Sequence, residues 1–435
     1  MLAPNRHALR GRILTFIDDP ALVGAQASHR YWSDGLIIIS NGLIETAGDA
    51  APLLAREGAA LAVADHRPHL ITPGFIDAHL HFPQTRIVAS YGEQLLDWLN
   101  RYVFPEEERY ADIAYARVGG RFFFDELLAS GTTTAAVFCS SHANSVTAFF
   151  EESSRRNTRM IAGKVMMDRN APPGLLDAVE SGYRDSKALL ARWHGKRRQL
   201  YAVSPRFAIT STAAQLEVAG NLMREHPTCY MQTHLSENLA EIATVKRLFP
   251  TARDYLDVYE KFALCGPRSL FGHCIHLNER ERQALYDTHS SAIFCPTSNL
   301  FLGSGLFNLA RMSDPARPVR IGVATDIGAG TSYSMLRTLG EAYKVLQLQG
   351  QRLDPFAAFH MMTRGNAQVL GLDDKIGAIA PGREADLIVL DAGATPAMAH
   401  RMQAAQSLGD ELFALITMGD ERSVRATYVI GELAR

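Results

Sequence analysis

The sequence predicts an α/β protein in which a (β/α)8 barrel of the TIM type is joined to a small β-sandwich domain formed from both chain termini. Three observations predict this fold. Short apolar segments alternate with helix-patterned polar segments through the middle of the chain, as βα units require. Histidine and acidic residues recur where these apolar segments end. The two terminal regions carry strand and turn patterns of a different kind, without the βα alternation.

Length, composition and charge limit the possible functions. The chain has 435 residues, a hydrophobic fraction of 47% and a formal net charge of -2. This near-neutral charge argues against a nucleic-acid partner and favours a small substrate. No run approaches the roughly 18 apolar residues of a membrane span, and the polar start lacks the apolar core of a signal peptide. Five cysteines without a CxxC motif suit reduced thiols, so we expect a cytoplasmic protein that does not bind membranes.

The N-terminal region is predicted to form β-structure. An apolar run at residues 36–39 breaks at Asn41-Gly42 and resumes at residues 43–46, which is a strong hairpin pattern. Near the C-terminus, residues 385–390 and 426–432 also have the pattern of strands.

The two terminal regions are expected to pair with each other. Neither is long enough to form a stable sheet alone. We therefore predict a composite β-sandwich domain of residues 1–69 and 375–435, which leaves residues 70–374 as the catalytic barrel.

The middle of the chain holds the eight strands expected of the barrel. The roughly 300 residues from 70 to 372 allow about 38 residues for each βα unit, which suits a (β/α)8 barrel with insertions. The predicted strands are residues 70–79, 132–138, 159–166, 200–204, 229–234, 269–273, 292–295 and 319–324.

Candidate metal ligands lie at the ends of several predicted strands. His79 and His81 end the first strand, and alternate residues of a strand share one face. His234, His273 and Asp326 end or closely follow three later strands. Because barrel enzymes carry their active sites at the C-terminal ends of the strands, this placement indicates a functional site rather than scattered structural histidines.

Three imidazoles and a carboxylate suit a borderline-soft divalent ion such as zinc. We predict that His79, His81, His234 and Asp326 hold one Zn2+ per chain. A position left to water would make the site catalytic.

Three residues are the predicted catalytic groups. Glu237 follows His234 by three residues and is the candidate proton shuttle. Asp326 can accept a proton from the attacking water, and His273 can hydrogen-bond to the attacking oxygen. The simpler interpretation of Glu237 is an acid favoured by the start of a helix, and its spacing from His234 favours the catalytic role.

Several motifs together resemble the amidohydrolase superfamily and, within it, the guanine deaminases. The general ones are the segment 73–81 with its His-x-His pair, the His234 and Glu237 pair, His273, Thr325-Asp326 and the C-terminal segment 381–386. The finer ones are Phe82-Pro83-Gln84, residues 91–99, residues 163–170, Ser204-Pro205-Arg206-Phe207, residues 295–305 and residues 325–331. The resemblance covers the chain from about residue 11 to its end.

The resemblance implies zinc-dependent hydrolysis of guanine to xanthine and ammonia, as in purine catabolism and salvage, by a homodimer. It also implies that Gln84 contacts the edge of the ring, that Arg206 supplies a cation near O6 and that Phe207 covers an apolar face. A site built to hydrogen-bond its substrate rejects analogues that lack the matching groups. The predicted substrate-binding residues are Gln84, Arg206, Phe207, His234, Glu237 and Asp326.

Alternatives remain at this stage. Lys164, at the end of a predicted strand, could be the carboxylated bridge of a two-metal site, or it could form a salt bridge with Asp168 or another acid. The chain could also be another deaminase or cyclic amidohydrolase of the superfamily, acting on a different aminopurine, a cytosine or a triazine. A non-enzymatic scaffold is a third possibility, and the presence of Glu237 beside the complete ligand set argues against it.

Overall fold

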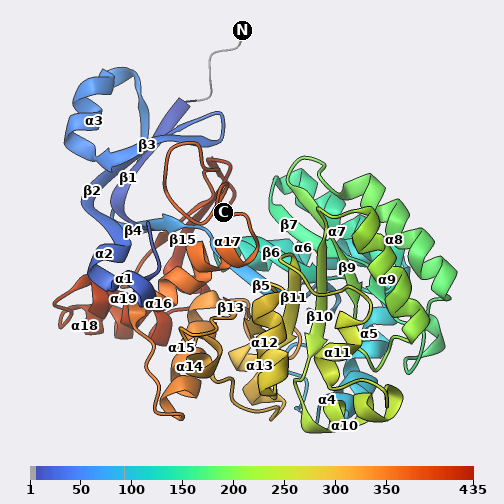
Figure 1. The fold of residues 1–435 in the computed structure, drawn as a ribbon. Helices are drawn as coiled ribbons and strands as arrows, with labels where there is room; N and C mark the ends of the chain where they lie inside the picture. Colours follow the sequence, from blue (N-terminus) through green and yellow to red (C-terminus); the bar gives the residue numbers. More distant parts are fainter. Residues whose placement is uncertain (1–5, 93) are drawn as a thin grey trace.

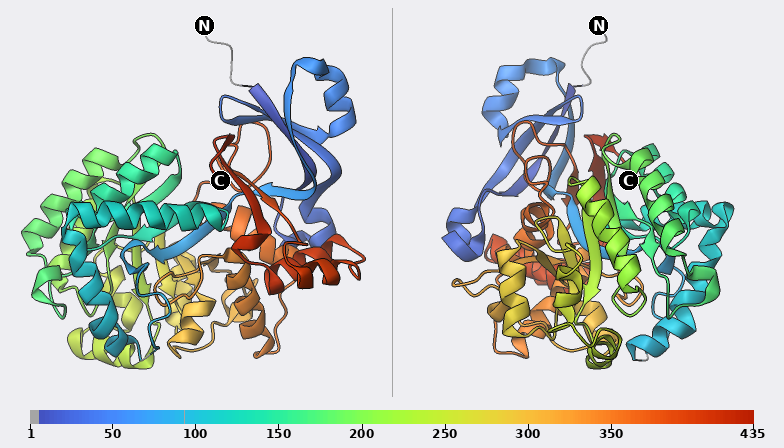
Figure 2. Two further views of the ribbon diagram at one scale, coloured as in Figure 1. Left: turned by 180° about the vertical axis from the view of Figure 1, so that it is seen from behind. Right: turned by 45° about the vertical axis from the view of Figure 1, so that its right-hand side comes forward.

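The computed structural model describes residues 6–92 and 94–435 and contains two sheets, one parallel and barrel-shaped and one formed by the chain termini (Figure 1). The predicted combination of a TIM-type barrel with a small β-domain from both termini is confirmed. In Figure 2 the N-terminal strands and the C-terminal strands lie side by side at one end of the barrel.

The barrel strands follow the order β5-β6-β7-β9-β10-β11-β12-β13, and β8 pairs with β9. All eight predicted strand regions contain an observed strand. The strands are β5 (Phe75–His81), β6 (Thr132–Phe138), β7 (Arg159–Gly163), β8 (Val165–Met166), β9 (Gln199–Pro205), β10 (Tyr230–Leu235), β11 (Ser269–His273), β12 (Ser291–Phe294) and β13 (Arg320–Val323).

Helices cover the outside of the barrel (Figure 1). The longer ones are amphipathic, as in α15, which buries Leu336, Leu339 and Val345. The barrel helices are α4 (Leu95–Trp98), α5 (Phe104–Glu108), α6 (Ile113–Ala129), α7 (Ala143–Arg156), α8 (Val179–Trp193), α9 (Ala213–Glu225), α10 (Leu239–Leu248), α11 (Tyr255–Glu260), α12 (Glu279–Asp287), α13 (Pro296–Phe301), α14 (Leu309–Met312), α15 (Met335–Gln347), α16 (Pro355–His360) and α17 (Asn366–Val369). The short 3-10 or π segments are η2 (Phe82–Gln84), η3 (Leu99–Val103), η4 (Arg109–Ala111), η5 (Pro173–Leu175) and η6 (Met361–Gly365).

The terminal sheet has seven strands in the order β16-β15-β14-β4-β1-β2-β3. Strands from the two ends of the chain meet where β4 pairs with β14. The strands are β1 (Arg6–Phe16), β2 (His29–Ser40), β3 (Leu43–Asp49), β4 (Ala62–Pro73), β14 (Leu387–Leu390), β15 (Val424–Val429) and β16 (Glu432–Leu433). The accompanying helices are α1 (Pro20–Val23), α2 (Ala25–Ser28), α3 (Ala50–Glu57), η1 (Gly58–Ala60), α18 (Pro396–Met402), α19 (Leu408–Met418) and η7 (Glu421–Ser423).

The first predicted barrel strand divides between the two sheets. Residues 70–73 end β4 of the terminal sheet, and β5 of the barrel begins at Phe75. Gly74 lies at the crossing, where a Cβ atom would come within 2.2 Å of the hydroxyl of Thr133. The apolar run is continuous in sequence because both sheets bury it, so only the change of strand partner marks the boundary.

The barrel interior is a packed layer rather than a pore. Each barrel strand except the two-residue β8 contributes to it or leads into it, and the segment 367–376 covers its base. The strand and strand-end residues of the layer are Ile76, Ala136, Ile161, Ala202, Tyr230, Leu270, Ile293 and Ala324. Such layers of side chains are typical of TIM-type barrels, and this one supports the site from below.

The barrel closes between β5 and β13 through side chains as well as backbone. The backbone N–H of Asp326 donates to the carbonyl of His79 at 2.9 Å. Nearer the base, the side-chain amide of Asn366 donates to the carbonyl oxygens of Ile76 and Val323 at 2.6 and 2.8 Å. The closure therefore ties two candidate metal ligands directly to each other.

Salt bridges join the terminal sheet to the base of the barrel. Arg159 and Arg198, at the start of β7 and beside the start of β9, pair with Glu384, and Arg198 also pairs with Asp386.

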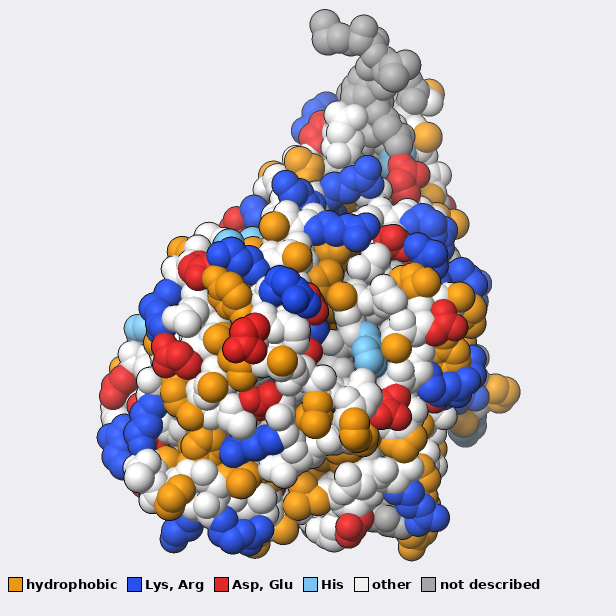
Figure 3. Space-filling model, turned by 90° about the vertical axis from the view of Figure 1, so that its right-hand side faces the viewer, with side chains coloured by type: hydrophobic (Ala, Val, Ile, Leu, Met, Phe, Trp, Pro, Cys, Tyr) orange, Lys and Arg blue, Asp and Glu red, His pale blue; other side chains and the backbone are white. Residues whose placement is uncertain are grey.

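On the face shown in Figure 3, basic and acidic side chains are interspersed. No helix among the described residues is long and apolar enough to cross a membrane.

Candidate metal centre and binding pocket

A bulge in β5 places both histidines of the His-x-His pair inside the barrel. Ile76 and Ala78 face the interior layer, whereas Leu80 packs in the outer core. The pairing of β5 with β6 shifts register in this region, and a bulge re-aims the side chains that follow it. His79 and His81 consequently both reach the site, and each is nearly fully buried.

Four side chains converge at the C-terminal end of the barrel. Nε2 of His81 lies 3.2 Å from Nε2 of His234. Oδ1 of Asp326 lies 3.4 Å from Nε2 of both His79 and His81. Four atoms bound tetrahedrally to zinc at about 2.0 to 2.1 Å would lie about 3.3 to 3.4 Å apart. The spacing of this set therefore fits a shared divalent ion.

The histidines of this set are poised as neutral ligands. Burial lowers the pKa of His79, and burial together with neighbouring positive charge lowers the pKa values of His81 and His234 well below the usual value. Nδ1 of His234 lies 2.7 Å from the carbonyl oxygen of Arg206, so an Nδ1–H donates there and leaves Nε2 free as a ligand. Nε2 of His79 is buried and has no hydrogen-bond partner among the described residues.

Two of the site residues adopt left-handed backbone conformations. His273 has φ 70° and Asp326 has φ 53°, although neither is a glycine. Such conformations cost free energy and concentrate at functional sites. Burial acts to raise the pKa of Asp326, but the neighbouring imidazoles of His79 and His273 outweigh burial and leave that pKa lowered, so Asp326 is a carboxylate.

Glu237 and His273 form a second pair beside the ligand set. Nε2 of His273 lies 3.4 Å from Oε2 of Glu237 and 3.8 Å from Oδ2 of Asp326. Burial lowers the pKa of His273, but the two carboxylates outweigh it and the net shift is upward. Burial raises the pKa of Glu237. Nδ1 of His273 lies 2.9 Å from Oδ1 of Asn299, which directs Nε2 toward the two acids.

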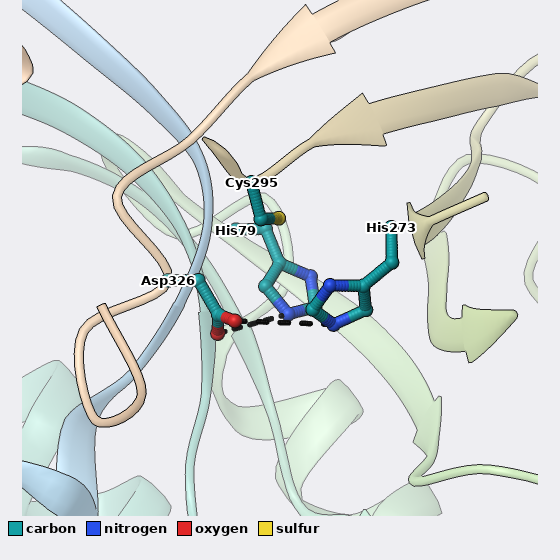
Figure 4. Close-up of side chains that lie close together, drawn as sticks. All are labelled: His79, His273, Cys295 and Asp326. Carbon is teal, nitrogen blue, oxygen red and sulfur yellow. Dashed lines mark ion pairs between the residues drawn. The ribbon is translucent and has the colours of Figure 1, made fainter. Parts of the chain in front are cut away.

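Figure 4 shows Cys295 beside His79, His273 and Asp326. The dashed ion pairs run from Asp326 to the two histidines. Burial raises the pKa of the Cys295 thiol well above its usual value. The thiol donates to the carbonyl oxygen of Ile293 at 3.6 Å, and Cys295 does not line the pocket, so the nitrogen and oxygen set is the better candidate.

Gln84 and Arg206 follow barrel strands β5 and β9 at the C-terminal end of the barrel, and a third residue joins them. Gln84 lies in η2, and Arg206 directly follows β9. Nε2 of Gln84 donates to Oε1 of Glu107 at 3.0 Å. Nη1 of Arg206 lies 2.9 and 2.8 Å from the two carboxylate oxygens of Glu107. Glu107 lies in α5 and is fully buried.

One pocket opens onto most of these groups, although His79, Cys295 and Glu107 lie behind its walls and do not line it. Including the part open to solvent, it encloses about 390 Å³. Its walls combine polar side chains on one side with Trp98, Leu99 and Leu302 on the other. The predicted site residues that line it are His81, Gln84, Arg206, Phe207, His234, Glu237, His273 and Asp326.

Lys164 does not reach this pocket. It ends the β7 region but is not among the lining residues, and its Nζ lies 2.5 Å from Oδ2 of Asp177. Both groups of the pair are buried. The geometry supports the salt-bridge interpretation, with Asp177 as the acid in place of Asp168, which instead binds Thr212.

Two further acids lie around the site, and neither was predicted from the sequence to have a role there. Glu107 holds Gln84 and Arg206, and Glu241 accepts backbone N–H bonds from Glu237 and Asn238 at 2.8 and 3.1 Å. Burial raises the pKa of Glu241 to about 7. Glu107 stands in a run of three glutamates, and nothing in that run distinguishes it. The position of Glu241 in a capping box could have indicated a local structural role.

Comparison with known proteins identifies the family. The sequence profile of the amidohydrolase family matches residues 70–434. The guanine deaminase of Escherichia coli (strain K12) is 50% identical over 429 residues, which cover 98% of this chain and 97% of that protein. The chain belongs to the guanine deaminase family of amidohydrolases. The predicted family is thereby confirmed.

Structures of guanine deaminases have the same fold as this chain. The E. coli enzyme aligns with a TM-score of 0.96 at 49% identity, covering 99% of each chain. Guanine deaminase from C. acetobutylicum, with guanine bound in its active site, aligns with a TM-score of 0.88 at 26% identity, covering 99% of this chain and 100% of that one. The match therefore spans the terminal sheet as well as the barrel.

Proposed function

We propose that the protein hydrolyses guanine to xanthine and ammonia, using one zinc ion per chain. One observation carries the proposal: His81, His234 and Asp326, which converge with His79 at separations suited to a divalent ion, line the same pocket as Gln84 and Arg206. The E. coli relative, 50% identical, is a guanine deaminase. In the overall reaction, the C2–O bond forms from water and the bond from C2 to the amino nitrogen breaks.

His79, His81, His234 and Asp326 would hold the metal, because their atoms converge at separations suited to it. When bound, zinc lowers the pKa of water to about 7 and so supplies hydroxide at neutral pH. The low pKa values of the histidines keep their nitrogen lone pairs available.

Glu237 moves protons in the proposed reaction. Burial raises its pKa, and Glu237 would deliver a proton to N3 of guanine as C2 is attacked. It would then take the proton of the new C2 hydroxyl group and pass it to the amino group, which leaves as ammonia. The proton that Asp326 took from the attacking water would finally restore Glu237. Asp326, which is ionised, accepts the proton of the attacking water. His273 donates a hydrogen bond to the attacking oxygen and so stabilises the tetrahedral intermediate.

Gln84, Arg206 and Phe207 orient the base. The cation of Arg206 would lie near O6, where adenine carries an amino group that cannot accept a hydrogen bond. Gln84 would bind the adjacent ring edge, and Phe207 would cover an apolar face. A site with such fixed polar groups rejects mismatched bases strongly because its own buried groups would be left unpaired.

An ultraviolet time course tests the proposal. Zinc-loaded protein is mixed with guanine at neutral pH, and the guanine spectrum is followed as it changes to that of xanthine. The same protein treated with a chelator is the control. Conversion only by the loaded protein is the expected result. No conversion by protein that holds one zinc per chain would overturn guanine as the substrate, and other aminopurines, cytosines and triazines would then be assayed.

The proposal extends to a homodimer in the cytoplasm that acts in purine catabolism. The formal net charge of -2 supports a neutral small substrate in preference to nucleic acid. Light scattering during size-exclusion chromatography measures the oligomeric state, and a mass twice the 47.8 kDa of one chain is expected. Elution at the mass of one chain would contradict the dimer and leave the proposed reaction unaffected.

A further inference from the structure

The recognition side of the pocket depends on a buried carboxylate that does not line the pocket itself. Glu107 has no exposed surface. It accepts hydrogen bonds from Nε2 of Gln84 at 3.0 Å and from Nη1 of Arg206 at 2.9 and 2.8 Å. A single side chain therefore binds both groups that approach the proposed base from this direction.

The chemistry of Glu107 sets the orientation of the Gln84 amide. An ionised carboxylate can only accept hydrogen bonds, so the Gln84 atom that faces it must be Nε2. Oε1 of Gln84 is thereby turned away from Glu107, and Gln84 lines the pocket. Gly328 makes this position possible, since a Cβ atom at residue 328 would come within 1.8 Å of Oε1. Gln84 thus presents an acceptor to the pocket.

Glu107 also determines how Arg206 faces the pocket. It occupies Nη1, while Nη2 and Nε make no hydrogen bond to the described residues. The guanidinium group lies 5.6 Å from the ring of Phe104, the first residue of the helix that carries Glu107. Arg206 also supports the metal centre through its main chain, because its carbonyl oxygen lies 2.7 Å from Nδ1 of His234. The remaining N–H groups of Arg206 form the donor side of the pocket.

We infer that Glu107 is a specificity-determining positioning residue, which holds Gln84 as an acceptor and Arg206 as a donor so that the pocket selects a purine with a donor at N1 and an acceptor at C6. This inference rests on the proposed function, because it explains which edge of the base the site reads. Guanine has N1–H beside O6 and matches both groups. A base with an unprotonated N1 beside an amino group would place an acceptor against the acceptor of Gln84 and a donor against the donor of Arg206.

The probe for this inference is 2,6-diaminopurine. It carries the same 2-amino leaving group as guanine, but its N1 is an acceptor and its C6 substituent is a donor. The ratio of kcat/KM for guanine to kcat/KM for 2,6-diaminopurine therefore measures how strongly the pocket reads this edge. Sites built around such hydrogen bonds discriminate by about 10⁴-fold or more, so we expect a ratio of that order for the wild-type protein.

Glu107→Gln is the decisive variant. It keeps the shape of the side chain but can donate to Gln84, which lets the Gln84 amide turn and present its NH2 group to the pocket. We expect guanine kcat/KM to fall about 100-fold and the selectivity ratio to fall by at least about tenfold. Zinc content is expected to stay unchanged. An equal loss on both substrates, with the ratio unchanged, would overturn the inference and indicate a merely structural role.

Glu106→Gln is the matched control. Glu106 is the neighbouring buried glutamate, but it binds Tyr115 and Arg109 and not the pocket residues. Its replacement is expected to leave the ratio unchanged, and a ratio that fell as far as in Glu107→Gln would overturn the inference. If Glu107→Gln does not fold, Glu107→Asp keeps the charge and shortens its reach, and the same fall in the ratio is expected. If the wild-type protein does not convert guanine, the proposed function itself is overturned. This outcome is distinct from a failure of the inference about Glu107, in which guanine is converted but the selectivity ratio does not respond to Glu107→Gln.

Discussion

The two ends of the barrel both bury charged and polar side chains, but they satisfy them differently. At the N-terminal end the charged groups that join the barrel to the terminal sheet are saturated with partners. Arg198 lies 2.6 Å from Glu384 and also pairs with Asp386, and Arg159 forms two hydrogen bonds to Glu384. Each charge there is matched by an opposite charge at contact distance.

At the C-terminal end the groups are left partly unsatisfied. Nε2 of His79 and Nδ1 of His81 have no hydrogen-bond partner among the described residues. Glu237 and Asp326 are two buried acids close to one imidazole, that of His273. Burying polar groups without partners is costly, so this arrangement suits groups that await a metal and a substrate.

The difference separates stability from function within one fold. Barrel enzymes carry catalysis at the C-terminal ends of their strands and stability at the other end. Here the same division is visible as unpaired histidine nitrogens at the C-terminal end and paired charges at the N-terminal end. Changes at the C-terminal end should therefore alter turnover with little loss of stability, and changes at the N-terminal end should do the reverse.

The largest effect is expected from metal removal. Chelation should lower turnover by more than about a thousandfold, because water without the metal has a pKa of 15.7 instead of about 7. Added zinc should restore activity. The melting temperature should fall as well, since a ligand bound only by the folded state stabilises it. Circular dichroism checks that the metal-free protein stays folded, and full activity in protein proven free of metal would contradict the assignment.

Glu237→Gln tests the C-terminal end without removing the metal. General acid-base groups contribute about 10² to 10⁴-fold, so we expect kcat to fall about a thousandfold while zinc remains bound. Stability should be unchanged or higher, because a buried ionisable group is replaced by a neutral one. Steady-state kinetics, zinc analysis and thermal unfolding measure the three quantities. Normal kcat, or a large loss of stability, would contradict the proposal that the C-terminal end of the barrel governs turnover and not stability.

Arg198→Met tests the opposite end. Removing Arg198 leaves Asp386 without its charged partner and Glu384 with Arg159 alone, and breaking a buried ion pair in this way costs about 3 kcal/mol or more. The kcat of the folded protein should stay within about twofold, because the change lies at the far end of the strands. Urea unfolding and initial rates below the transition give the two values. A drop in kcat without loss of stability would reverse the assignment of the two ends.

The smallest effect is expected in the pH dependence of stability at the salt bridges that join the terminal sheet to the barrel. Burial acts to raise the pKa of Glu384, but hydrogen bonds and charges from Arg159 and Arg198 leave it below its usual value of 4.5. Its ionised form is therefore favoured by folding, and the resulting stability is present above pH 4.5 and lost as the pH falls through the lowered pKa. Glu384→Gln should be less stable than wild type at pH 7, and the gap should narrow in acid. Melting temperatures of both proteins from pH 7 into acid measure this difference. A difference that does not change with pH would contradict the expected direction of the effect.

Much of the fold could be predicted because its patterns are local. Apolar runs such as 132–138 and 269–273 coincide with β6 and β11. The candidate ligands could be identified because His79 and His81 are close in sequence and because strand ends converge in a barrel. The change of sheet near Gly74 has no pattern of its own in the sequence, since the apolar run crosses from one sheet to the other without a break.

The sequence by itself determined the class of fold and a chemically complete set of candidate metal ligands, since periodicity and residue type require no knowledge of long-range contacts. Only the tertiary structure decided which buried charges pair. It joined Lys164 to Asp177 and away from the pocket, and it brought Glu107 to Arg206 from 99 residues away. The physical reason is that a hydrogen bond depends on distance and direction in space, and neither can be inferred from identical neighbouring glutamates in the sequence.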